Sequence, residues 1–125
     1  MLDHIGLDVI SYDASKVFYK TVLAPLGYDV VEETHGFCGF GPPGKPLFWV
    51  HELVGDRSSE AAPIHVAFAA VGRAAVDAFY AAAIKIGARD NGAPGLREIY
   101  HPNYYGAFVF DPDGNNIEAV CHRPE

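Results

Sequence analysis

The sequence lacks any long hydrophobic run. No apolar segment approaches the roughly 20 residues that a membrane-spanning helix needs, and the first residues, Met-Leu-Asp-His, carry no basic region of the kind that begins a signal peptide. We therefore expect a cytoplasmic protein without a membrane segment. In that compartment Cys38 and Cys121, the two cysteines of the chain, are expected to be buried reduced thiols rather than a disulfide.

Positive charge is also scarce. Nine Lys and Arg residues stand against 16 Asp and Glu, the formal net charge is −7, and the basic residues form no cluster. Such a surface excludes nucleic acid and anionic membranes as expected partners, because both are held by basic patches. A small-molecule substrate or a protein partner remains. The 125 residues suffice for one domain with a core of its own.

The first part of the chain, module one (about 1–54), has the pattern βαβββ. Residues 2–10 alternate between apolar and polar side chains, as in a half-buried strand, and residues 13–24 carry apolar side chains at helical spacing. Pro25 and Gly27 then end the predicted helix. Three short strands are predicted at 28–33, 37–40 and 47–53.

A polar linker at 55–62 leads to module two (about 63–122), where the pattern recurs. A strand at 64–71 and a helix at 73–86 are followed by a predicted loop at 91–95 that contains Gly and Pro. The segment 105–120 then reads as strand, turn and strand, with Asp-Pro-Asp-Gly at 111–114 supplying the turn.

The two modules are an internal repeat. His4 and His65, Phe18 and Phe79, and Tyr19 and Tyr80 are each 61 positions apart, and residues 40–50 align on 110–120 without gaps. Each module alone would expose one face of a small sheet. We therefore predict an α+β fold of two βαβββ modules related by pseudo-twofold symmetry, with a concave mixed sheet and the helices outside.

Three polar side chains share the predicted concave face. Strand alternation turns Ile117 and Ala119 toward the helices, so Glu118 points the other way, and the same rule places His4 and His65 on that face. Two imidazoles and a carboxylate are a ligand set for a divalent metal. A lone histidine on a strand is more often a hydrogen-bonded or exposed residue, and without a metal the histidines could serve as donors to the carboxylate.

The duplicated module, the strand histidines and the element Asp-Pro-Asp-Gly-Asn-x-Ile-Glu at 111–118 together resemble the vicinal oxygen chelate superfamily. This superfamily includes glyoxalase I, type I extradiol dioxygenases, fosfomycin-modifying enzymes and bleomycin-binding proteins. The resemblance implies that His4, His65 and Glu118 bind a divalent Fe, Mn, Ni or Zn ion, which a substrate chelates through adjacent oxygens. It also implies a homodimer, in which a site can take its ligands from one chain or from both.

Departures from the family pattern narrow the implied activity. Glyoxalase I has a fourth ligand, a carboxylate in the first module, where the gap-free internal alignment puts Phe48, so true glyoxalase I activity is disfavoured. Dioxygenases of the family have a tyrosine near the position of Phe108. We expect a glyoxalase-like lyase or isomerase or a dioxygenase-like enzyme, and the alternative is a metal-free binding protein of the bleomycin-resistance type.

A loop before the last two strands offers groups for proton transfer. His101, Tyr104 and Tyr105 are the candidate catalytic residues, with His101 preferred as the acid or base. The structural alternative is that the tyrosines pack on the edge of the sheet.

Overall fold

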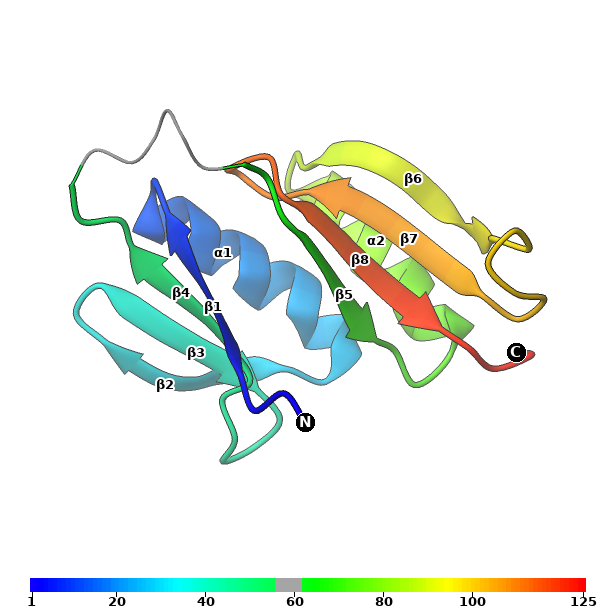
Figure 1. Ribbon diagram of the computed structural model, residues 1–125, viewed down its shortest axis with the longest axis horizontal. Helices are drawn as coiled ribbons and strands as arrows, with labels where there is room; N and C mark the ends of the chain where they lie inside the picture. The colour runs from blue at the N-terminus through cyan, green and yellow to red at the C-terminus, as the bar shows by residue number, and fades with distance from the viewer. Residues whose placement is uncertain (56–61) are drawn as a thin grey trace.

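The computed structural model describes residues 1–55 and 62–125, so most of the predicted linker at 55–62 lies outside the described residues. Two four-stranded sheets stand side by side, each with a helix packed behind it (Figure 1). The elements of the first module are β1 (Ile5–Val9), α1 (Tyr12–Leu23), the 3-10 helix η1 (Ala24–Leu26), β2 (Asp29–Thr34), β3 (Phe37–Gly41) and β4 (Phe48–Glu52). Those of the second are β5 (His65–Ala69), α2 (Arg73–Lys85), β6 (Arg89–Leu96), β7 (Tyr105–Phe110) and β8 (Asn116–Cys121).

The two sheets repeat one topology, with strand orders β1-β4-β3-β2 and β5-β8-β7-β6. In each sheet the first and last strands of the module pair in parallel and the other pairs are antiparallel. The predicted α+β class with two βαβββ modules is confirmed. Figure 1 shows β1 and β5 as the neighbouring edges of the two sheets, with α1 and α2 in contact behind them. In the described part of the chain no helix is both long and apolar enough to cross a membrane.

Local signals in the sequence begin and end the helices. The Ser11 hydroxyl accepts a hydrogen bond from the backbone N–H of Ala14 at the start of α1, which is the usual role of an N-cap serine. Gly27 follows η1 with a φ of 85°, and Gly87 follows α2 with a φ of 86°, a backbone conformation that favours glycine. The cysteines Cys38 and Cys121 are buried and unbonded to each other, as expected.

One core lies between the sheets and the helices and joins the two modules. The Tyr19 hydroxyl of α1 donates a hydrogen bond of 2.5 Å to Asp111 Oδ2, in the turn between β7 and β8. The other oxygen of Asp111 accepts the backbone N–H groups of Asp113 and Asn115. The turn that starts β8 is therefore held from inside by one buried carboxylate, and this sets the place of Glu118 further along the strand.

The sheet register corrects one prediction. In the second module Glu118 pairs with Ala67, and the equivalent pair in the first module is Trp49 with Gly6. Trp49, and not Phe48, is thus the counterpart of Glu118. Phe48 instead points to the helix layer, where its ring lies 4.6 Å from that of Tyr19.

The reason is the length of the connection before the last strand of each module. Residues 42–47 separate β3 from β4, whereas residues 111–115 separate β7 from β8. The first connection is therefore one residue longer, and a slip of one residue moves every side chain of a strand to the opposite face. The gap-free alignment across this turn was therefore wrong. The conclusion drawn from it is unchanged, because neither tryptophan nor phenylalanine can supply a fourth metal ligand.

The predicted loop at 91–95 is part of strand β6. Its glycines lie at two register shifts against β7, at Asp90/Gly92 and Gly92/Gly95. Asp90 Oδ1 accepts the N–H of Gly92, which has a φ of 147°. Pairing with β7 therefore overrides a local composition that is typical of a loop, and the glycines serve as bulges.

Candidate functional site

The candidate site lies on the face of the second sheet that points away from α2, which we call the open face. At its centre is Glu118 of β8, whose neighbours Ile117 and Ala119 both lie in the core. The carboxylate of Glu118 is nevertheless only 1% exposed, because other side chains cover it on the open face. A buried carboxylate needs partners, since an unpaired charge is costly away from water.

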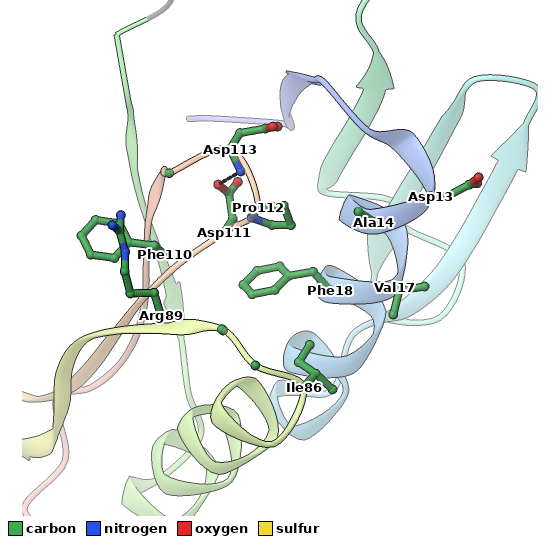
Figure 2. A pocket seen from close by; sticks show the side chains of 13 residues that line it. Asp13, Ala14, Val17, Phe18, Ile86, Arg89, Phe110, Asp111, Pro112 and Asp113 are labelled. Atoms are coloured by element: carbon green, nitrogen blue, oxygen red, sulfur yellow. Dashed lines mark hydrogen bonds between the residues drawn. The ribbon is translucent and has the colours of Figure 1, made fainter.

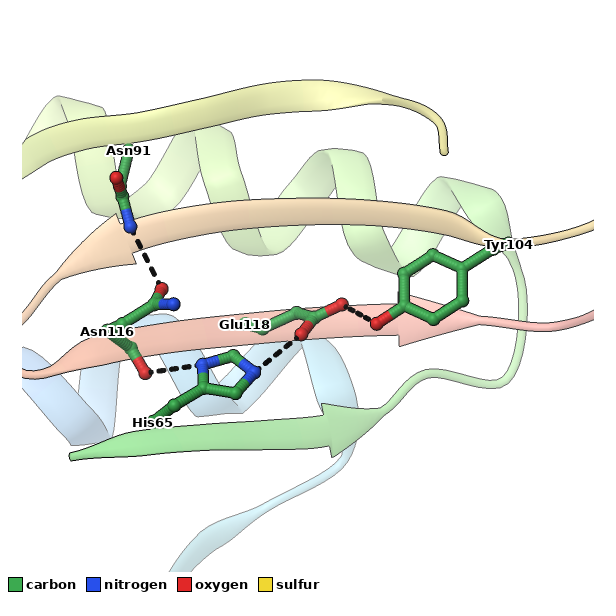
Figure 3. A network of polar contacts seen from close by, with 5 residues as sticks. All are labelled: His65, Asn91, Tyr104, Asn116 and Glu118. Atoms are coloured by element: carbon green, nitrogen blue, oxygen red, sulfur yellow. Dashed lines mark hydrogen bonds and ion pairs between the residues drawn. The ribbon is translucent and has the colours of Figure 1, made fainter. Parts of the chain in front are cut away.

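His65 provides one partner. It is the first residue of β5, which pairs in parallel with β8, and its Nε2 lies 3.0 Å from Glu118 Oε2 (Figure 3). Its Nδ1 lies 3.2 Å from the backbone carbonyl oxygen of Asn116. Because a carbonyl only accepts, Nδ1 carries the hydrogen of the neutral ring, and Nε2 faces the carboxylate either with a lone pair or with a second proton. The predicted convergence of these two side chains is thus seen in the structure.

Tyr104 provides the other partner, because its hydroxyl donates a hydrogen bond to Glu118 Oε1 (Figure 3). Burial and then this bond raise the pKa of Tyr104 well above its ordinary value of 10.0, so the phenol stays protonated near neutral pH. Gly106 makes room for the contact. A Cβ atom there would stand 3.0 Å from Glu118 Oε1 and 3.3 Å from the Tyr104 ring.

The other two candidate catalytic residues lie away from the carboxylate. His101 Nε2 is 2.7 Å from His122 Nδ1, and both rings pack against that of Tyr104. Tyr105 donates a hydrogen bond to Asp77 of α2, on the opposite side of the sheet. His101 therefore packs against Tyr104 rather than against Glu118, and the exposed His122 joins the same cluster.

His4 does not join Glu118 and His65 in a group of three ligating side chains within the described residues. The two histidines line one cleft of about 380 Å³ between β1 and β5, whose lining also includes Phe48 and Phe68. The His4 ring is 58% exposed, and its Nδ1 is 2.7 Å from Asp3 Oδ1. Within residues 1–55 and 62–125, no three His, Cys, Asp or Glu side chains gather closely enough to hold a metal ion.

Sequence reasoning missed three residues of the open face. Gly106 opens the space for the carboxylate, Asn91 of β6 donates a hydrogen bond to the Asn116 side chain (Figure 3), and Arg97 packs beside Phe108. Gly106 and Phe108 have the same strand parity, so alternation alone could have placed this glycine. Asn91 and Arg97 were out of reach, because the bulges of β6 shift its parity.

A larger groove lies elsewhere, between the start of α1, the end of α2 and the β7–β8 turn (Figure 2). It has a volume of about 930 Å³, and Phe18 and Ile86 contribute to its apolar wall. Two of the three acids that line it are already engaged, because Asp111 holds the turn and Asp113 accepts the N–H of Ile10. None of the described side chains that line it is a histidine, so the open face is the better candidate for chemistry.

Comparison with protein families agrees with this architecture. The sequence model of the Glyoxalase/Bleomycin resistance protein/Dioxygenase superfamily matches residues 1–119. The chain belongs to this superfamily. A search of curated proteins found no match.

Solved structures show the same fold. A glyoxalase/bleomycin resistance protein from Albidiferax ferrireducens T118 is 28% identical, with a TM-score of 0.77 and 97% of each chain covered. A glyoxalase/bleomycin resistance protein/dioxygenase family enzyme from Burkholderia phytofirmans PsJN is 24% identical, with a TM-score of 0.73 and 98% of each chain covered. A lactoylglutathione lyase from Agrobacterium tumefaciens is 19% identical, with a TM-score of 0.66, and the match covers 94% of this chain and 90% of that one. The last two likenesses concern the fold alone.

Proposed function

We propose that this superfamily member is a metal-dependent enzyme that acts on a small oxygenated substrate, as a glyoxalase-like lyase or isomerase or as a dioxygenase-like enzyme. The observation that carries the proposal is the pair formed by Glu118 and His65 on the open face, with Nε2 of the imidazole 3.0 Å from the carboxylate. His4 is proposed as the third ligand of a divalent Fe, Mn, Ni or Zn ion.

The donor set fits such an ion. The Nδ1–H of His65 is held by a backbone carbonyl, which is the arrangement that usually orients a metal-binding histidine and directs its other nitrogen at the metal. The hydrogen bond from Tyr104 to one oxygen of Glu118 likewise orients the carboxylate and leaves the other oxygen beside His65. A cation between the imidazole and the carboxylate would take the place of a shared proton.

The position of His4, the proposed third ligand, supports a homodimer in which two copies share each site. Within the described part of one chain, His4 does not gather with His65 and Glu118 into a metal-binding group. In residues 1–55 and 62–125 no helix covers the open face or the corresponding face of the first sheet (Figure 1). We therefore propose that His4 of one copy completes the site formed by His65 and Glu118 of a second copy.

The residues of the open face have separate tasks in this proposal. A bound divalent ion would act as a Lewis acid toward adjacent oxygens of the substrate. Tyr104, protonated near neutral pH, would donate a hydrogen bond or a proton rather than accept one. The ring of Phe108, 6.3 Å from that of His65, forms an apolar wall that excludes water from the same place.

The second candidate function is metal-free binding of a small molecule. One observation favours it: Glu118 already has a partner at each oxygen, Tyr104 at one and His65 at the other, without any ion. An imidazolium–carboxylate pair would satisfy the buried charge, and the open face would then serve as a binding surface beside Phe108.

Metal analysis of the purified protein tests the first function against the second. We expect about one divalent ion per chain, lost in His65→Ala and Glu118→Ala, and retained in the control His35→Ala, which alters an exposed histidine in the first module. His4→Ala should lose the ion as well, and mixing it with Glu118→Ala should restore a fraction of the sites if two copies share them. Wild-type protein that binds no added Fe, Mn, Ni or Zn ion would refute the enzyme and favour the metal-free binder.

A further inference from the structure

Arg97 lies on the open face in the same region as the proposed metal site. Gly92 of β6 pairs with Phe108 of β7, which pairs in turn with Glu118 of β8, so these three residues form one row across the face. The guanidinium of Arg97 packs over this row, with its carbon 5.4 Å from the centre of the Phe108 ring. The His65 ring stacks on the same phenyl ring, with 6.3 Å between the ring centres.

The backbone of β6 forms a fitted seat for this guanidinium. A Cβ atom on Gly92 would stand 3.2 Å from Nη2 of Arg97, and one on Gly95 would stand 3.1 Å from Nη1. Nη2 also donates a 2.8 Å hydrogen bond to the carbonyl oxygen of Ala93. The two glycines thus leave space for the guanidinium, and the carbonyl of Ala93 fixes its position beside Phe108.

The charge of Arg97 has no acidic partner in residues 1–55 and 62–125. Within these described residues its guanidinium donates to backbone carbonyls alone, those of Ala93 and Leu96. A guanidinium has five N–H donors in a planar fork that matches a carboxylate, so donors remain for a ligand. An unpaired cation is notable in a chain with a net charge of −7, where acidic side chains outnumber basic ones.

We infer that Arg97 binds a carboxylate group of the substrate, so that the substrate is a small carboxylic acid whose other oxygens face His65 and Glu118. This inference rests on the proposed function and adds the class of substrate to it. Glu118 repels an anionic group, whereas Arg97 attracts one, so the two ends of the face fix the direction in which the molecule lies. The Phe108 ring between them supports the short carbon skeleton.

The test compares lactate with lactamide, its neutral counterpart, by NMR titration of the protein as purified. We expect wild-type protein to bind lactate roughly tenfold more tightly, which is the scale of one charge-assisted hydrogen-bonded pair. In Arg97→Gln the preference should fall to within about twofold. The matched control is Arg89→Gln, which removes the same charge at the start of β6, where Arg89 stacks over Phe110 at 4.2 Å. This variant should keep the preference.

Metal content measured on the same samples separates this inference from the proposed function. Loss of the preference in Arg97→Gln with the metal content unchanged supports the inference. Wild-type protein without a preference for lactate, or Arg97→Gln with an unchanged one, overturns it even where the metal is bound. If the protein binds no metal but still shows a preference for lactate that depends on Arg97, the metal-dependent function is refuted and the role of Arg97 is supported.

Discussion

Replacing Tyr104 by phenylalanine removes one hydroxyl and leaves the rest of the open face in place. That hydroxyl donates to Glu118, a carboxylate only 1% exposed, so the variant leaves a buried acceptor without its partner. Hydrogen bonds to charged groups contribute about 1.5–3 kcal/mol. We therefore expect Tyr104→Phe to lower the free energy of unfolding by about 2 kcal/mol, since Tyr104 is itself only partly buried.

The adjacent tyrosine supplies the matched control. Tyr105 also donates to a carboxylate, that of Asp77, but this bond lies exposed on the other side of the sheet. Water and salt screen such a contact, so Tyr105→Phe should cost roughly 0–1 kcal/mol. Urea unfolding followed by circular dichroism at pH 7 measures both. Equal losses in the two variants, or an unchanged stability of Tyr104→Phe, would show that the buried contact does not hold the carboxylate as described.

Three further variants test the core and the charged surface. Phe48→Ala should lower the free energy of unfolding by about 3–5 kcal/mol, because it empties a fully buried position against Tyr19. Trp49→Ala, at a half-buried position, should lower it clearly less. Urea unfolding measures both, and a larger loss in Trp49→Ala than in Phe48→Ala would contradict the register. Hydrogen bonding to Lys16 lowers the pKa of Glu33 from 4.5, so this pair stabilises the fold above that pH and its contribution is lost as the pH falls through the lowered pKa. Glu33→Gln should therefore lower Tm at pH 6 and converge with wild type at low pH, and a gap in Tm that persists at low pH would contradict the assignment.

The periodicity of the sequence correctly predicted the fold and the position of two residues of the candidate site, Glu118 and His65. Alternation of side chains placed Glu118 and His65 on the same face, and the parallel pairing of β5 with β8 then brings them together. It could not show that Tyr104 and Tyr105 have different partners, because that depends on which of them starts β7 and on the helix behind the sheet. The proposed role of His4 likewise depends on contact with a second copy of the chain, and the sequence of one chain does not show how two copies pack.

The amino-acid sequence by itself determined the two βαβββ modules, because a repeated pattern of apolar side chains can bury itself in few ways. Tertiary structure alone decided the register of β4, the bulged pairing of β6 and the seat of Arg97. Each of these depends on contacts between segments distant in the chain, where one extra residue in a turn or one bulge reverses the direction of a side chain. Local pattern is therefore informative about which residues form a strand and uninformative about what that strand meets.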